Sequence, residues 1–89
     1  MTRFYYPNGK VVDEPDKKFS VSELIKLFGG WYYLRQVPEF SGKMDYYLIT
    51  KELYGIYPED YPKLNKKASE VFGREIYGLA ILCPESMVY

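Results

Sequence analysis

The feature that most constrains the fold is a short helix with a clear signal at each end. Ser20 and Glu23 have the spacing of a capping box, in which the serine hydroxyl accepts from the N–H of Glu23 and the glutamate carboxylate accepts from the N–H of Ser20. Gly29 and Gly30 follow at the other end, where glycine takes the left-handed conformation without a steric cost. The sequence therefore predicts a helix that starts after Ser20 and stops at the glycine pair.

Segments with β-strand character lie on both sides of this helix. Asn8-Gly9 tolerates the positive φ of a tight turn, which predicts a short hairpin across residues 4–12. Residues 31–37 and 44–50 are rich in aromatic and β-branched side chains and predict two antiparallel strands. Neither face of residues 31–37 is cleanly polar, which indicates an interior strand or a face reserved for a partner.

A second helix and a last strand complete the predicted order. The helix should start near Asn65 and end before Gly73. Its predicted buried stripe is Leu64, Ala68, Val71 and Phe72. Residues 76–83 are mostly apolar, are closed by Pro84, and predict a strand buried on both faces if it sits centrally.

The predicted class is therefore α+β, in the order ββ-α-ββ-α-β. We expect a mainly antiparallel sheet with the two short helices packed on one face. The other face would then need cover from a partner protein or from a second copy of the chain. The chain of 89 residues predicts one domain, residues 1–89, because a chain of this length cannot support two separate cores.

The composition indicates the cellular compartment in which the protein folds. Hydrophobic residues make up 47% of the chain, enough for it to fold without a metal or a disulfide. Cys83 is the only cysteine, so no internal disulfide is possible. The first residues lack the apolar run of a signal peptide, and no apolar run is long enough to span a membrane. We therefore expect a cytoplasmic protein that is neither exported nor inserted.

The same composition argues against catalysis. The chain has no histidine, the commonest general base and metal ligand, and one cysteine cannot build a zinc site. We expect Cys83 to be an inert buried thiol rather than a nucleophile. Four carboxylates could in principle form a pair of general acid and general base, but we expect them to be solvated surface charges. They are Asp45, Glu52, Glu59 and Asp60. We predict no catalytic residue, no metal and no cofactor. An enzyme with an unrecognised carboxylate or tyrosine mechanism stays open as an alternative to the binding functions given below.

The charge balance bears on nucleic-acid binding. Twelve basic and twelve acidic residues give a net charge of zero, so the chain lacks the positive field that binds a phosphate backbone. We therefore expect no duplex nucleic acid as partner. The cluster of Lys63, Lys66 and Lys67 is more typical of a solvated helix face than of a phosphate site. A small nucleotide stays open as a ligand.

Tyrosine is the residue type that stands out, with eleven in the chain. A tyrosine combines an apolar ring with a polar tip, which suits protein interfaces and also base stacking. We expect the tyrosine pairs of the strands to cover the sheet. The irregular segment of residues 51–62 is different, because long loops in compact domains are often functional. The predicted binding residues are Tyr54, Tyr57, Tyr61, Glu59 and Asp60.

Several short patterns together resemble a small domain family of uncharacterised function that phages and mobile elements carry. They are the helix from Ser20 to Leu24 that runs into Gly29-Gly30-Trp31, the strand before Thr50, the Asn-x-x-Ala pattern of Asn65 and Ala68, and the closing Gly73, Ile76 and Gly78. The resemblance spans most of the chain, although the tyrosine-rich segment replaces a shorter acidic and glycine-containing turn. It implies a compact protein of the bacterial cytosol made by a phage or an integrated element.

Two functional hypotheses follow. Small proteins of that origin often occupy a host protein or sequester a small signal. We therefore expect a non-enzymatic binding protein, such as an inhibitor of a host defence protein, whose own aromatic-rich surface binds a host protein or a second copy of the chain. The alternative is a binder of nucleotides or single-stranded nucleic acid, in which sheet tyrosines stack on bases and basic side chains neutralise phosphate. Those basic candidates are Lys10, Arg35, Lys43, Lys63, Lys66 and Lys67.

Overall fold

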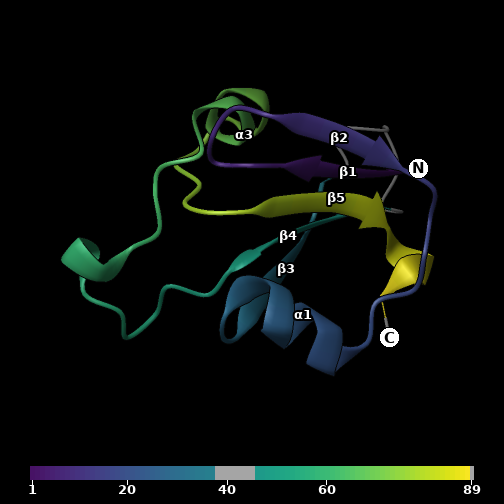
Figure 1. Cartoon of the computed structure of the whole chain (residues 1–89), viewed down its shortest axis with the longest axis horizontal. Helices are drawn as coiled ribbons and strands as arrows, with labels where there is room; N and C mark the ends of the chain where they lie inside the picture. The colour runs from purple at the N-terminus through teal and green to yellow at the C-terminus, as the bar shows by residue number, and fades with distance from the viewer. Residues whose placement is uncertain (38–45, 89) are drawn as a thin grey trace.

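The computed structural model describes residues 1–37 and 46–88. The elements follow one another as β1 (Thr2–Tyr5), β2 (Val11–Glu14), α1 (Val21–Phe28), β3 (Tyr32–Gln36), β4 (Tyr46–Lys51), the 3-10 turn η1 (Pro58–Asp60), α3 (Lys66–Phe72), β5 (Ala80–Pro84) and the 3-10 turn η2 (Glu85–Met87). The five strands form one antiparallel sheet in the order β2-β1-β5-β4-β3 (Figure 1). The predicted α+β class is confirmed, and the two 3-10 turns are additions to the predicted order.

β5 is the central strand and joins two hairpins. Ile81 lies opposite Phe4 of β1 on one side and opposite Ile49 of β4 on the other. The four residues from Ala80 to Cys83 are each at most 2% exposed. The predicted central strand with two buried faces is therefore confirmed, although it begins at Ala80 and not at residue 76.

The two helices pack on opposite faces of the sheet, so the prediction of both on one face was wrong (Figure 1). Ile81 and Leu82 are neighbours in β5, and neighbouring strand residues point to opposite faces. Ile81 packs in a core with Leu24 of α1, whereas Leu82 packs in a second core with Ala68 of α3. A strand with apolar side chains on both faces needs cover on both, and each helix supplies one side.

Two smaller expectations also differ from the structure. β3 is an edge strand, because β4 is its only neighbour in the sheet of described residues, so the interior-strand alternative for residues 31–37 is wrong and the face reserved for a partner stays a prediction. Val71 is 47% exposed, so the buried side of α3 consists of Ala68 and Phe72. A helix of 7 residues turns only a narrow side toward the sheet, and Val71 lies outside it.

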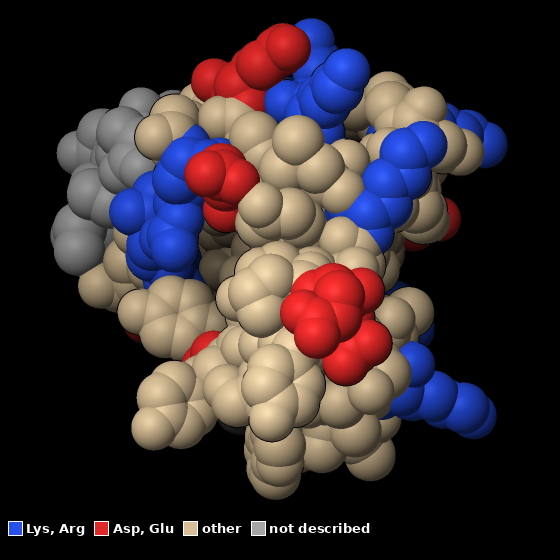
Figure 2. Space-filling model, turned by 90° about the vertical axis from the view of Figure 1, so that its left-hand side faces the viewer, with Lys and Arg blue, Asp and Glu red and all other residues tan. Residues whose placement is uncertain are grey.

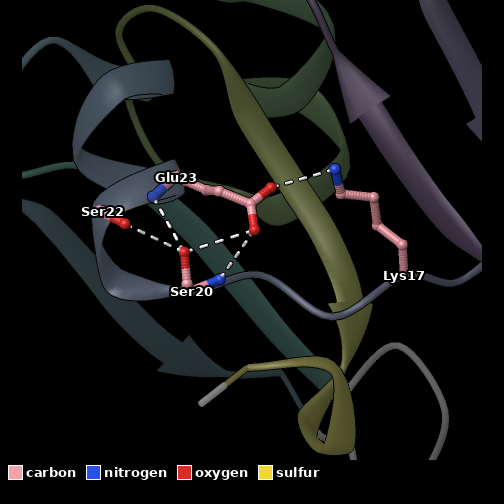
Figure 3. Close-up of polar contacts among 4 residues, drawn as sticks. All are labelled: Lys17, Ser20, Ser22 and Glu23. Carbon is pink, nitrogen blue, oxygen red and sulfur yellow. Dashed lines mark hydrogen bonds and ion pairs between the residues drawn. The ribbon is translucent and has the colours of Figure 1, made fainter.

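Both ends of α1 are fixed by hydrogen bonds. Ser20 Oγ accepts from the N–H of Glu23 at 3.2 Å, and Glu23 Oε1 accepts from the N–H of Ser20 at 3.4 Å (Figure 3). At the other end Gly29 has a φ of 67° in the left-handed region. The Lys51 ammonium of β4 donates to the Phe28 carbonyl at 2.9 Å, which ties the last turn to the sheet. The predicted capping box and glycine stop are confirmed.

Asn65 is the buried polar residue that holds α3 to the sheet. Its side chain is fully buried. Oδ1 accepts from the N–H of Ala68 at 3.1 Å and caps the helix, while Nδ2 donates to the carbonyls of Tyr5 and Gly78, both at 2.8 Å. Both amide donors and the amide oxygen are thus used inside the protein. The sequence predicted the helix start at Asn65 but not its bond to β1.

The substitution Asn65→Asp tests this bridge. Aspartate keeps the oxygen that caps α3 but replaces the donor by an oxygen that faces two buried carbonyls. We expect the free energy of unfolding to fall by about 3 kcal/mol or more at neutral pH, measured by urea denaturation. Asn8→Asp is the matched control, because Asn8 is exposed and its Oδ1 accepts from the N–H of Lys10. Equal stability of the two variants would contradict the bridging role.

Glu23 couples stability to pH. The Lys17 ammonium, 3.0 Å from Glu23 Oε2, and the N–H of Ser20 lower the pKa of the Glu23 carboxyl from its ordinary value of 4.5. A carboxylate with a pKa lowered by folding stabilises the protein above its unfolded pKa, and this contribution is lost as the pH falls. We expect Glu23→Gln to lose less stability than the wild type as the pH drops below 4.5.

Acid titrations of thermal unfolding would measure this difference. Glu70→Gln is the matched control, because Glu70 is an exposed carboxylate on the other helix. It should show the acid sensitivity of the wild type. If Glu23→Gln were as acid-sensitive as Glu70→Gln, the capping carboxylate would not contribute to the pH dependence.

Candidate binding surface

The segment of residues 52–64 connects β4 to α3 and projects beyond the end of the sheet (Figure 1). It has local hydrogen bonds of its own. The Leu53 carbonyl accepts from the N–H of Ile56 at 3.0 Å, and the Tyr57 carbonyl accepts from the N–H of Asp60 at 2.8 Å. The loop is therefore built from successive tight turns that fix its course.

The five predicted binding residues lie on this loop with different exposures. Tyr54 is 93% exposed and Tyr57 is 70% exposed. The two acidic residues of η1 are exposed as well. Tyr61 differs, because it is half-buried and its ring centroid lies 5.1 Å from that of Tyr77. We refer to Tyr54, Tyr57, Glu59 and Asp60 as the loop surface, and assign Tyr61 to the base of the loop.

The base of the loop is anchored against the residues that precede β5. The N–H of Gly78 donates to the Lys63 carbonyl at 2.8 Å. Gly78 has a φ of 79°, and a Cβ there would lie 3.0 Å from Cβ of Pro62, so this contact requires glycine. The Tyr77 hydroxyl donates to the Glu75 carboxylate, and this bond raises the pKa of Tyr77 above its ordinary value. The rings and backbone below the loop surface are thus held in place.

A pocket of about 200 Å³ opens beside the loop, between the strands β3 and β4 and the residues that follow α3. Leu48 and Ile76 are buried and form part of its lining. Its polar lining includes Tyr33, Arg35, Thr50, Glu52, Arg74 and Glu75. Lys51 lines it as well, so two arginines, one lysine and two glutamates allow the pocket to receive a partner group of either charge or a polar side chain.

Sequence reasoning named Arg35 only as a phosphate contact of the alternative hypothesis and did not name Arg74 or Glu75. The pocket forms where β3 and β4 meet the residues after α3, and this contact joins segments that are distant in sequence. The sequence signal that could have pointed to it is the Arg-Glu pair directly after the helix stop at Gly73. That signal is weak, because charged residues after a helix are common at a solvated surface.

Two exposed aromatic residues lie at the same end of the sheet. Trp31 is 68% exposed and Tyr33 is 49% exposed. The Trp31 carbonyl accepts from the N–H of Glu52 at 3.0 Å, which places the tryptophan beside the first residue of the loop. The expectation that strand tyrosines cover the sheet holds for Tyr5, which is 2% exposed, but not for Tyr33.

Figure 2 looks onto the end of the molecule that carries the loop. Uncharged surface fills much of the lower part of the view, acidic groups lie near the middle and toward the top, and basic side chains lie at the left, top and right. In this view the basic side chains are separated by uncharged and acidic groups. Such spacing does not favour a long phosphate backbone, which requires a continuous basic track.

No group of three or more Cys, Asp or Glu side chains within the described ranges has the arrangement needed to hold a metal ion. Cys83 is fully buried, and burial raises the pKa of its thiol to about 11, so it is protonated at neutral pH. Asp45, one of the carboxylates considered for an acid and base pair, lies outside the described residues.

Comparisons with known proteins found no relative. No protein-family model matches the chain, and neither the curated proteins nor the solved structures contain a match. The resemblance to a phage-borne domain family therefore rests on the sequence patterns alone. Within residues 1–37 and 46–88, no helix has the length and hydrophobicity required to cross a bilayer.

The buried state of Cys83 gives a direct test of the central strand. We expect a disulfide reagent such as Ellman's reagent to label the native protein at least about 100-fold more slowly than the urea-unfolded protein, because the protonated thiol is reached only when the sheet opens. The rate is measured by the absorbance of the released thiolate. Labelling of the native protein at the unfolded rate would show that β5 is accessible.

Proposed function

We propose that this protein is a non-enzymatic binding protein that recognises another protein through the loop surface. The observation that carries the proposal is the exposure of two large aromatic side chains, Tyr54 at 93% and Tyr57 at 70%, on a loop with an anchored base. Tyrosine is enriched at the centres of protein interfaces, where its ring buries a large apolar area at a low entropic cost.

The acidic residues of η1 define the kind of partner. Glu59 and Asp60 are exposed and lie within three residues of Tyr57. A basic patch on the partner would meet this charge, which favours fast association and the correct orientation. The tyrosine rings would supply most of the affinity, and the pocket beside the loop would receive one side chain of the partner.

The sequence resemblance supports a host protein as that partner. We propose that the protein acts in the bacterial cytoplasm as a product of a phage or mobile element. It would inhibit a host defence protein by occupying the surface of that protein. Inhibition by occupation requires no reaction centre in the inhibitor. It requires a rigid base and an exposed contact surface, which the anchored loop provides.

Recovery of the partner is the first experiment. The tagged protein is incubated with nuclease-treated bacterial lysate, and the eluate is read by mass spectrometry and by its absorbance at about 260 nm, where nucleotide bases absorb. One stoichiometric host protein would support the proposal. Retained absorbance without a protein would favour the alternative, a nucleotide or single-stranded nucleic acid that stacks on sheet tyrosines and whose phosphate is neutralised by basic residues such as Arg35 at the pocket.

The double substitution of Tyr54→Ala and Tyr57→Ala tests the loop surface. We expect it to weaken partner binding by about 100-fold or more, because tyrosine is enriched among the hot-spot residues whose truncation costs about 2 kcal/mol or more. Binding is measured by titration calorimetry, and the fold by its unfolding midpoint, which should not change. Tyr61 is left in place because it packs on Tyr77.

The matched control is the double substitution of Leu27→Ala and Val71→Ala. Both side chains are 47% exposed apolar residues, and they lie on the two helices rather than on the loop. This control should bind like the wild type. Unchanged affinity in the tyrosine variant, with the partner still bound by the wild type, would refute the placement of the site on the loop surface.

A further inference from the structure

β3 ends the sheet with an outer side that no described strand covers. The register shows which of its backbone groups point outward. The Trp31 carbonyl accepts from the N–H of Glu52, and the bonds of an antiparallel pair recur at every second residue, so Tyr33 also bonds to β4. Tyr32 and Leu34 therefore direct their N–H and C=O groups away from β4. These groups form a template for another strand.

The opposite edge of the sheet is protected against such pairing, and β3 is not. β2 carries Asp13 and Glu14, and Pro15 follows it directly. Charged residues and proline on an edge are the features by which natural sheets discourage a further strand. The β3 sequence contains one charge and no proline, and the neighbouring exposed side chains are the apolar Trp31 and Tyr33.

We propose that β3 pairs antiparallel with β3 of a second copy of this chain, about a twofold axis at Tyr33. In this register Tyr32 lies opposite Leu34 of the second copy, and the outward groups of these residues form about four hydrogen bonds across the interface. Tyr33 meets its own copy. Trp31 lies opposite Arg35 of the second copy on the same face.

The side chains of β3 are self-complementary in this register. Trp31 and Tyr33, which are 68% and 49% exposed in one chain, both gain cover from the second copy. The one charged residue of the strand meets an aromatic ring and not a like charge. A shift of the axis to Leu34 would place Trp31 opposite Val37, which is already fully buried within its own chain. The axis at Tyr33 is therefore the better register.

Leu34→Pro tests the pairing. Proline removes the outward N–H of Leu34, which does not bond to β4, so the pairing of β3 with β4 should persist while the dimer is lost. Circular dichroism checks the fold of the variant, because the Leu34 side chain also packs against the core next to α1. We expect wild-type protein to approach twice its monomer mass in sedimentation equilibrium at rising concentration, and Leu34→Pro to weaken dimerisation about tenfold or more. Val11→Pro makes the equivalent change on the β2 edge and should dimerise like the wild type. A wild type that stays monomeric, or a Leu34→Pro protein that dimerises normally, would overturn the proposal.

A cysteine variant tests the register. In Tyr33→Cys the two introduced thiols would face each other across the axis at a position without hydrogen bonds, where side chains lie closest. Mild oxidation should then link the chains covalently, while Leu34→Cys should not cross-link at a comparable rate. The absence of a covalent Tyr33→Cys dimer, in a variant that still dimerises, would overturn the assigned axis. Tyr33 and Arg35 also line the pocket, but the pairing does not involve Tyr54 or Tyr57, so the Tyr54→Ala and Tyr57→Ala variant should dimerise like the wild type.

Discussion

The buried amide of Asn65 is the interaction on which the arrangement of the candidate site depends. One side chain caps α3, bonds to β1 and bonds to the carbonyl of Gly78. It thereby fixes the helix over one face of the sheet and also fixes the residues that lead into β5. Those residues form one wall of the pocket and carry Tyr77, on which the base of the loop rests. A polar group in the core therefore determines the geometry of a surface that it does not touch.

The fold was predictable from the sequence wherever the determinants lie close together. The helix that starts after Ser20 and the helix that starts after Asn65 each have a polar cap and a glycine stop within ten residues of chain, as a short-range pattern requires. The positions of the helices on opposite faces, and of β3 at the edge, depend instead on pairing between distant residues. Phe4 beside Ile81 is an example, because local propensity cannot specify which distant strand completes a pair.

The candidate site likewise has some features that the local sequence predicts and others that depend on contacts between distant residues. Tyr54 and Tyr57 lie in an irregular segment with glycine and proline, so a surface position could be argued from the sequence. The contact of Tyr61 with Tyr77 and the meeting of Arg35 with Arg74 at one pocket require the folded chain. Trp31 shows the limit of pattern analysis, because an apolar residue in a strand-like segment suggests burial, whereas the edge position exposes it.

The central position of β5 also has a consequence for biosynthesis. The hairpin of β1 with β2 and the hairpin of β3 with β4 leave the ribosome before the strand that lies between them. An isolated two-stranded hairpin is at best marginally stable in water. The complete sheet therefore cannot form until β5 has been synthesised, because β5 supplies the only strand contact between the two hairpins among the described residues. Translation that stops short of β5 yields polypeptides open to proteases, so quality control can separate complete products from incomplete ones by their folding alone.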